Sequence, residues 1–121
     1  MIVPLSEDDL QIAVCEFLDV ALPPDAVYFA VANGGSRNKA EAAKLKRMGV
    51  KPGIPDLVVC YRSECLFIEL KTAAGVLSGI QKQMHERLDH TGFDLGVCRS
   101  VEGVEDFLLS MGIPLRALVS A

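Results

Sequence analysis

The hydrophobic residues of this chain fall into short segments whose spacing is either helical or strand-like. The first segment predicts a helix from Ser6 to about Ala21, because apolar residues recur every three or four positions and Ser6 is a candidate N-cap followed by acidic residues. Residues 62–65 separate the segments over 56–61 and 66–71 by a length that suits an antiparallel hairpin. The later segments predict, in order, a strand over 27–32, a helix over 37–48, strands over 56–61 and 66–71, a helix over 78–89, a strand over 93–98 and a helix over 101–111. This order predicts an α/β fold, with a mixed central sheet of about four strands flanked by helices.

Length and composition suit one domain over residues 1–121. Half of the 121 residues are hydrophobic, and the chain shows no internal repeat, low-complexity tract or Pro/Gly/Ser-rich linker. No apolar stretch approaches the roughly 18 to 20 residues of a membrane-spanning helix, and no secretion signal is recognisable, so we expect the protein in the cytoplasm of a bacterial or phage-infected cell. Cys15, Cys60, Cys65 and Cys98 form no CxxC pair, which argues against structural zinc and against a disulfide framework.

Charge is distributed unevenly along the chain. The formal net charge is −4, which by itself argues against a polyanionic partner. However, half of the twelve Lys and Arg residues fall between positions 37 and 51, where Glu41 is the only acid. These basic residues are Arg37, Lys39, Lys44, Lys46, Arg47 and Lys51. A solvated helix face would account for them equally well, but together they also form a candidate surface for a nucleic-acid backbone.

Two neighbouring predicted strands carry the residues with the clearest chemistry. Asp56 begins the first strand after Pro55, and Glu69 and Lys71 lie near the end of the next, one residue apart. Alternate side chains of a strand share a face, so Glu69 and Lys71 point the same way, and Asp56 can approach Glu69 if the strands pair. Two carboxylates so placed favour a cation between them, and oxygen ligands of this kind suit Mg²⁺ or Mn²⁺.

Lys71 completes a set that suits phosphodiester hydrolysis. An ammonium group can orient an attacking water or stabilise charge on a phosphate, and a metal ion can activate that water. Pro55 would serve only to set the backbone where the strand begins. An ordinary hairpin with a Glu69–Lys71 ion pair at its edge would show the same spacing, so these residues alone leave both readings open.

Three motifs in this order and spacing resemble those of one nuclease family. They are VKPGIPDL over 50–57, IELK over 68–71, and GVLS over 75–78 followed by Gln81. Together they resemble the VRR-NUC domain, a branch of the PD-(D/E)xK nuclease superfamily, and the resemblance spans nearly the whole chain. It implies a restriction-endonuclease-like core and a Mg²⁺ cofactor that Mn²⁺ can replace.

The resemblance also implies roles for individual residues. Asp56, Glu69 and Lys71 would carry the family's catalytic roles, with Asp56 and Glu69 as metal ligands. The backbone carbonyl of Leu70 would be a further ligand.

Glu7 and Gln81 are candidates for the same site. Glu7 lies seven positions before Val14, within about 20° on a helical wheel, so it should point inward as the family's first-helix acid and hold metal directly or through water. It could instead be an exposed acid at the helix N-terminus. Gln81 has capping-box spacing to Ser78, yet it also lies where the family's active-site glutamine is expected.

The predicted turn before the basic helix is a candidate DNA contact. Its glycines would allow exposed N–H groups to approach a phosphate, although an ordinary turn would contain the same glycines. The candidate residues are Asn33, Gly34, Gly35, Ser36 and Arg37. His85 and His90 have no HNH or zinc-ligand context, so both are predicted to be surface or packing residues.

These features predict a metal-dependent, structure-selective DNA endonuclease. Short stand-alone members of the family resemble four-way-junction resolvases, so the expected substrate is a Holliday junction or other branched DNA, and the expected assembly is a homodimer. Candidate residues for the dimer interface are Leu115, Leu118 and Val119, or Ile2 and Val3. The alternatives are a flap, nicking or general DNA nuclease with the same site, a DNA-binding scaffold that does not cleave, and a chance match on another fold.

Overall fold

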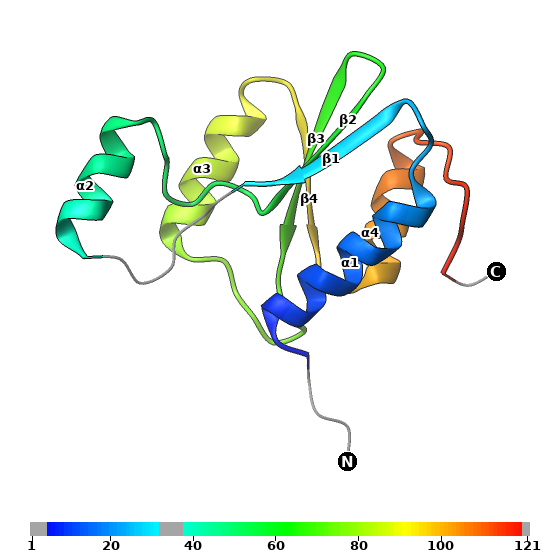
Figure 1. Cartoon of the computed structure of the whole chain (residues 1–121), viewed down its shortest axis with the longest axis horizontal. Helices are drawn as coiled ribbons and strands as arrows, with labels where there is room; N and C mark the ends of the chain where they lie inside the picture. Colours follow the sequence, from blue (N-terminus) through cyan, green and yellow to red (C-terminus); the bar gives the residue numbers. More distant parts are fainter. Residues whose placement is uncertain (1–4, 32–37, 120–121) are drawn as a thin grey trace.

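The computed structural model describes residues 5–31 and 38–119. Within these residues the chain alternates helices and strands, as the sequence predicts (Figure 1). The elements are α1 (Glu7–Ala21), β1 (Ala26–Ala30), α2 (Lys39–Arg47), β2 (Leu57–Tyr61), β3 (Glu64–Leu70), α3 (Gly79–Asp89), β4 (Asp94–Cys98) and α4 (Val101–Ser110). The predicted α/β class is confirmed.

The strands form one mixed sheet in the order β1-β2-β3-β4. β2 pairs antiparallel with both β1 and β3, whereas β4 runs parallel to β3 after the α3 crossover. Leu57 pairs with Ile68, and Leu70 pairs with Cys98. The end of β3 that carries the predicted site therefore lies between the beginning of β2 and the end of β4.

The connection between β2 and β3 is tighter than the predicted four-residue loop over 62–65. Arg62 and Ser63 alone make the turn, with φ of 46° and 68°, and Glu64 already pairs with Tyr61. Two positive φ values in succession are typical of a two-residue hairpin turn whose twist matches that of the strands. The pairing therefore extends to Cys60 and Cys65, which lie directly opposite each other.

One face of the sheet is covered by α1 and α4, which pack against each other and against the sheet (Figure 1). Ser6 caps α1 by accepting a hydrogen bond from the Asp9 N–H, and the predicted apolar stripe of the helix is buried. The core between these layers includes Val14, Leu18, Leu57, Ile68 and Leu70.

The opposite face carries α3, while α2 projects away from the sheet (Figure 1). Neither helix has a fully buried residue. The predicted helix over 37–48 is observed as α2 with Asn38 as its N-cap, and Arg37 lies outside the described residues. Among the described helices, none is long and apolar enough to cross a membrane.

Candidate active site

Asp56 is fixed by backbone groups of the strands on either side of it. Its Oδ2 accepts a hydrogen bond from the Leu70 N–H at 2.7 Å, and its carbonyl accepts one from the Val31 N–H at 2.9 Å. These contacts come from β3 and from the residue that follows β1. The carboxylate is therefore positioned by the sheet itself, as the predicted strand pairing requires.

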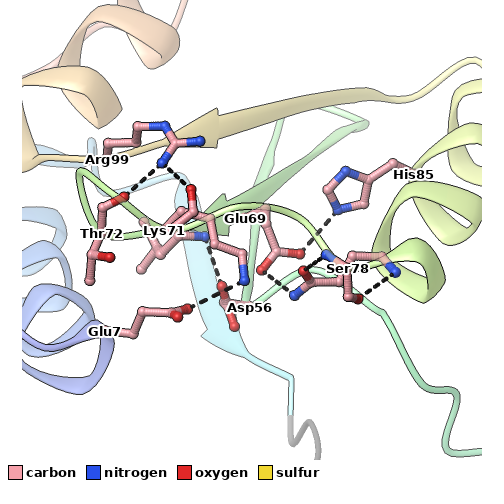
Figure 2. Close-up of polar contacts among 11 residues, drawn as sticks. Glu7, Asp56, Glu69, Lys71, Thr72, Ser78, His85 and Arg99 are labelled. Atoms are coloured by element: carbon pink, nitrogen blue, oxygen red, sulfur yellow. Dashed lines mark hydrogen bonds and ion pairs between the residues drawn. The ribbon is translucent and has the colours of Figure 1, made fainter.

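Glu69 is a buried carboxylate on the sheet face that α3 covers. Its side chain is only 1% exposed. Its Oε1 lies 3.0 Å from Nε2 of His85, and its Oε2 accepts a hydrogen bond from Nε2 of Gln81 at 3.4 Å (Figure 2). Both oxygens are thus held by residues of one helix.

The pKa of Glu69 is raised from 4.5 to about 8. The largest cause is burial, followed by a hydrogen bond to Asp56 and the charge of Asp56, while Lys71 acts in the opposite direction. Two neighbouring carboxylates repel each other when both are ionised. The raised pKa favours the protonated form of Glu69 at neutral pH, and a cation beside it would oppose this effect.

Lys71 lies next to this pair and is mostly buried, with 11% of its side chain exposed. Its N–H donates to the Cys98 carbonyl at 3.0 Å, which continues the β3–β4 pairing one residue past β3. Its Nζ lies 3.9 Å from Oε1 of Glu7, the first residue of α1 (Figure 2). Glu7 lies at the edge of the cleft next to Lys71, but half of its side chain is exposed, so it does not point inward as predicted.

Gln81 makes both of the contacts that its position in the sequence allows. Its Oε1 accepts from the Ser78 N–H at 2.9 Å and the Ser78 Oγ accepts from the Gln81 N–H, which together form a capping box at the beginning of α3. The remaining amide nitrogen donates to Glu69. The helix cap therefore orients the amide toward the buried carboxylate.

A cleft of about 1210 Å³ opens beside these groups. Glu7, Asp56, Lys71 and Gln81 line it, and Glu69 lies beneath them, in contact with Asp56 and Gln81. Gly53 lets the loop before β2 approach α3 closely, because its φ is +78° and a Cβ there would lie 2.7 Å from the Ile80 carbonyl oxygen. This close approach joins two walls of the cleft.

The basic residues divide between the cleft and the outer surface. Lys46 of α2 and Lys51 line the cleft together with Asp56. Lys39, Lys44 and Arg47 are exposed and are not among its lining residues. The candidates Asn33, Gly34, Gly35, Ser36 and Arg37 lie outside the described residues.

The structure places two residues at the site that sequence reasoning missed. His85, predicted to be a surface or packing residue, contacts Glu69 and is 13% exposed, whereas His90 is exposed at the end of α3. His85 follows Gln81 by four positions, so helical periodicity could have placed both on one face. Arg99 donates to the Thr72 and Gly75 carbonyls in the loop after Lys71, which no motif signals (Figure 2).

The donor set at this site fits a hard divalent cation. Within residues 5–31 and 38–119, no three His, Cys, Asp or Glu side chains form a ready-made metal cluster. Glu69 is buried beside Asp56, and a cation that takes both carboxylates and completes its shell with other oxygens would reduce the repulsion between them. Mg²⁺ is commonly held by one or two carboxylates together with water and phosphate.

Comparisons with known proteins show the family and the fold of the chain. The family model of the VRR-NUC domain matches residues 9–102. A solved structure described as a VRR_NUC domain protein superposes with a TM-score of 0.69 at 23% identity, covering 93% of each chain. A search of curated proteins finds no match.

Proposed function

Since the chain belongs to the VRR-NUC domain family of nucleases, we propose that it is a Mg²⁺-dependent endonuclease that hydrolyses DNA phosphodiester bonds. The observation that carries this proposal is the pair formed by buried Glu69 and cleft-lining Asp56 beside Lys71. A basic cleft wall, with Lys46 and Lys51, faces the same space. An acid pair, an ammonium group and a phosphate-binding wall are the parts that metal-assisted phosphodiester hydrolysis needs.

The ion would be held by the carboxylates of Asp56 and Glu69 and by the carbonyl of Leu70, a residue that also lines the cleft. Glu7 would join them through water, because it lies at the rim and is half exposed. A bound Mg²⁺ would activate water and neutralise phosphate charge. Mn²⁺ has the same preference for oxygen ligands and should replace it.

The chain's own side chains would bind and orient the substrate. Lys71 pairs with Glu7 and lies close enough to Glu69 to act on its charge, and its ammonium group can position the attacking water and stabilise charge that develops on the phosphate. Lys46 and Lys51 would bind the DNA backbone on the opposite wall. Residues 33–37, which lie outside the described part of the chain, remain predicted DNA contacts.

For the substrate, we favour branched DNA such as a four-way junction, cut by a homodimer. Symmetric cleavage needs two active sites, which a two-fold dimer supplies. Leu118 and Val119 are 46% and 38% exposed, so they are available to a second subunit. A DNA substrate also agrees with the expected location in the cytoplasm of a bacterial or phage-infected cell.

The decisive assay incubates the protein with labelled four-way junction, flap, single-stranded and linear duplex DNA, in Mg²⁺, Mn²⁺ or EDTA. Asp56→Asn and Lys71→Met should lower the cleavage rate by at least about a hundredfold, a loss typical of removing a transition-state contact. Asp89→Asn and Lys82→Met, the same changes at exposed positions of α3, serve as matched controls and should cleave normally.

Each outcome of this assay bears on a different part of the proposal. Cleavage that persists in EDTA or in both site variants would refute the metal-dependent mechanism. Paired symmetric nicks in the junction alone would support a resolvase, whereas equal cutting of all substrates would favour a general nuclease. Tight DNA binding without cleavage in any metal would favour the scaffold.

A further inference from the structure

Glu69 is held from one side by α3 alone. Gln81 and His85 lie one helical turn apart and contact different oxygens of the same carboxylate, at 3.4 and 3.0 Å. Gln81 is itself oriented by the Ser78 cap, so the amide has little freedom. The imidazole of His85, 13% exposed, makes the shorter of the two contacts.

The role of Glu69 depends on the direction of its carboxylate. The side chain has several rotatable bonds, and a metal ligand must present its oxygens within a narrow range of angles. An ionised carboxylate only accepts hydrogen bonds and offers about four lone-pair sites. One bond from His85 and one from Gln81 therefore leave acceptor sites on both oxygens for a cation.

We propose that His85 is a positioning residue of the metal site: its Nε2–H donates to Oε1 of Glu69 and fixes that carboxylate toward Asp56. This inference rests on the proposed function, since it assumes that Glu69 holds a divalent cation. Hydrogen bonds from outside the ligand shell commonly change metal affinity by about 10- to 100-fold. His85 would thus set how tightly the ion is held without touching the substrate.

A packing role for His85 predicts a different result. The ring fills space between α3 and the sheet, so its removal could lower stability while leaving the metal site intact. Metal affinity measured without DNA separates the two roles. Substitution by Gln keeps an N–H donor at a position similar to His Nε2, whereas Asn is too short to reach Oε1 and Leu keeps bulk without a donor.

The experiment titrates Mn²⁺ into wild type, His85→Leu, His85→Asn and His85→Gln by calorimetry, with folding checked by circular dichroism. We expect His85→Leu and His85→Asn to bind Mn²⁺ about tenfold more weakly, and His85→Gln to bind within about threefold of wild type. Cleavage by the weak binders should recover at saturating metal. The control His90→Ala removes an exposed histidine from the same helix and should bind as wild type does.

The outcomes distinguish this inference from the proposed function. If folded His85→Asn binds Mn²⁺ as tightly as His85→Gln, the positioning role is wrong, even when His85→Leu fails to fold. If the wild type binds Mn²⁺ and the variants differ as expected but no DNA is cut, the nuclease proposal fails and the positioning role stands. A wild type that binds no divalent cation overturns both.

Discussion

The raised pKa of Glu69 predicts an unusual pH dependence of stability in the metal-free protein. The folded chain retains a proton on Glu69 up to about pH 8, whereas in the unfolded chain the carboxyl ionises near 4.5. Between these values the folded state binds more protons, so the free energy of unfolding falls as pH rises. Glu69→Gln keeps the shape of the protonated acid and removes the titration, so this fall should disappear in the variant.

The size of the effect follows from the same pKa. One additional bound proton changes the free energy of unfolding by at most about 1.4 kcal/mol per pH unit at 25 °C. The pKa of His85 is lowered, mainly by burial and also by Lys71, so below about pH 6.5 its own titration opposes that of Glu69. From pH 6.5 to 8 the titration of His85 therefore contributes little. The fall in the free energy of unfolding due to Glu69 amounts to at most about 2 kcal/mol over this range.

Urea unfolding in EDTA, followed by circular dichroism between pH 6.5 and 8, measures this fall. We expect the wild type to lose about 1 to 2 kcal/mol over this range relative to Glu69→Gln, and to be less stable than the variant at pH 8. Glu86→Gln, an exposed change on α3, should follow the wild type. Equal slopes for wild type and Glu69→Gln would refute the reasoning, because Glu69 would then titrate alike in both states.

Three further predictions test the packing at Gly96, the Cys60–Cys65 thiol pair and the hydrogen bonds of Arg99. Gly96→Ala should lower stability by about 1 to 3 kcal/mol in thermal unfolding, because a Cβ would lie 2.7 Å from the Phe107 ring; an unchanged melting temperature would contradict this close packing. Oxidised glutathione should join Cys60 and Cys65, whose Sγ atoms are 3.4 Å apart, with a mass loss of two hydrogens that Cys60→Ser prevents. Arg99→Ala removes two hydrogen bonds to loop carbonyls and should raise proteolysis of the loop after Lys71, as measured by limited digestion; wild-type resistance would show that the bonds are not needed.

Much of the fold could be predicted because its local signals agree with one another. Ser6 and Ser78 each cap the helix that they were expected to begin, and the apolar runs over 56–61 and 66–71 overlap the observed β2 and β3. The predicted length of the hairpin turn was wrong because Arg62-Ser63 lacks the Gly or Asn that usually accompanies positive φ. In that turn, strand pairing determines the backbone against local preference.

The site could be predicted where one strand, or two strands expected to pair, relates its residues. Glu69 and Lys71 share a face by strand geometry, so their proximity follows from two positions in the sequence. Helical periodicity could have placed His85 on the face of Gln81, but its contact with Glu69 also depends on how α3 lies over the sheet, which spacing within the helix does not specify. The contacts of Arg99 likewise depend on where the loop after β3 meets the end of β4.

The neighbouring carboxylates that lower the stability of the folded protein without an ion would favour the binding of a cation. Glu69 is buried beside Asp56, and this raises its affinity for a proton. A divalent cation competes with that proton, so binding of the ion should strengthen as pH rises and should stabilise the folded chain most where the empty chain is weakest. Gln81 and His85 of α3 both contact Glu69, and α3 also lines the cleft. An ion held by Glu69 would therefore stabilise the position of a helix that lines the cleft proposed to bind DNA.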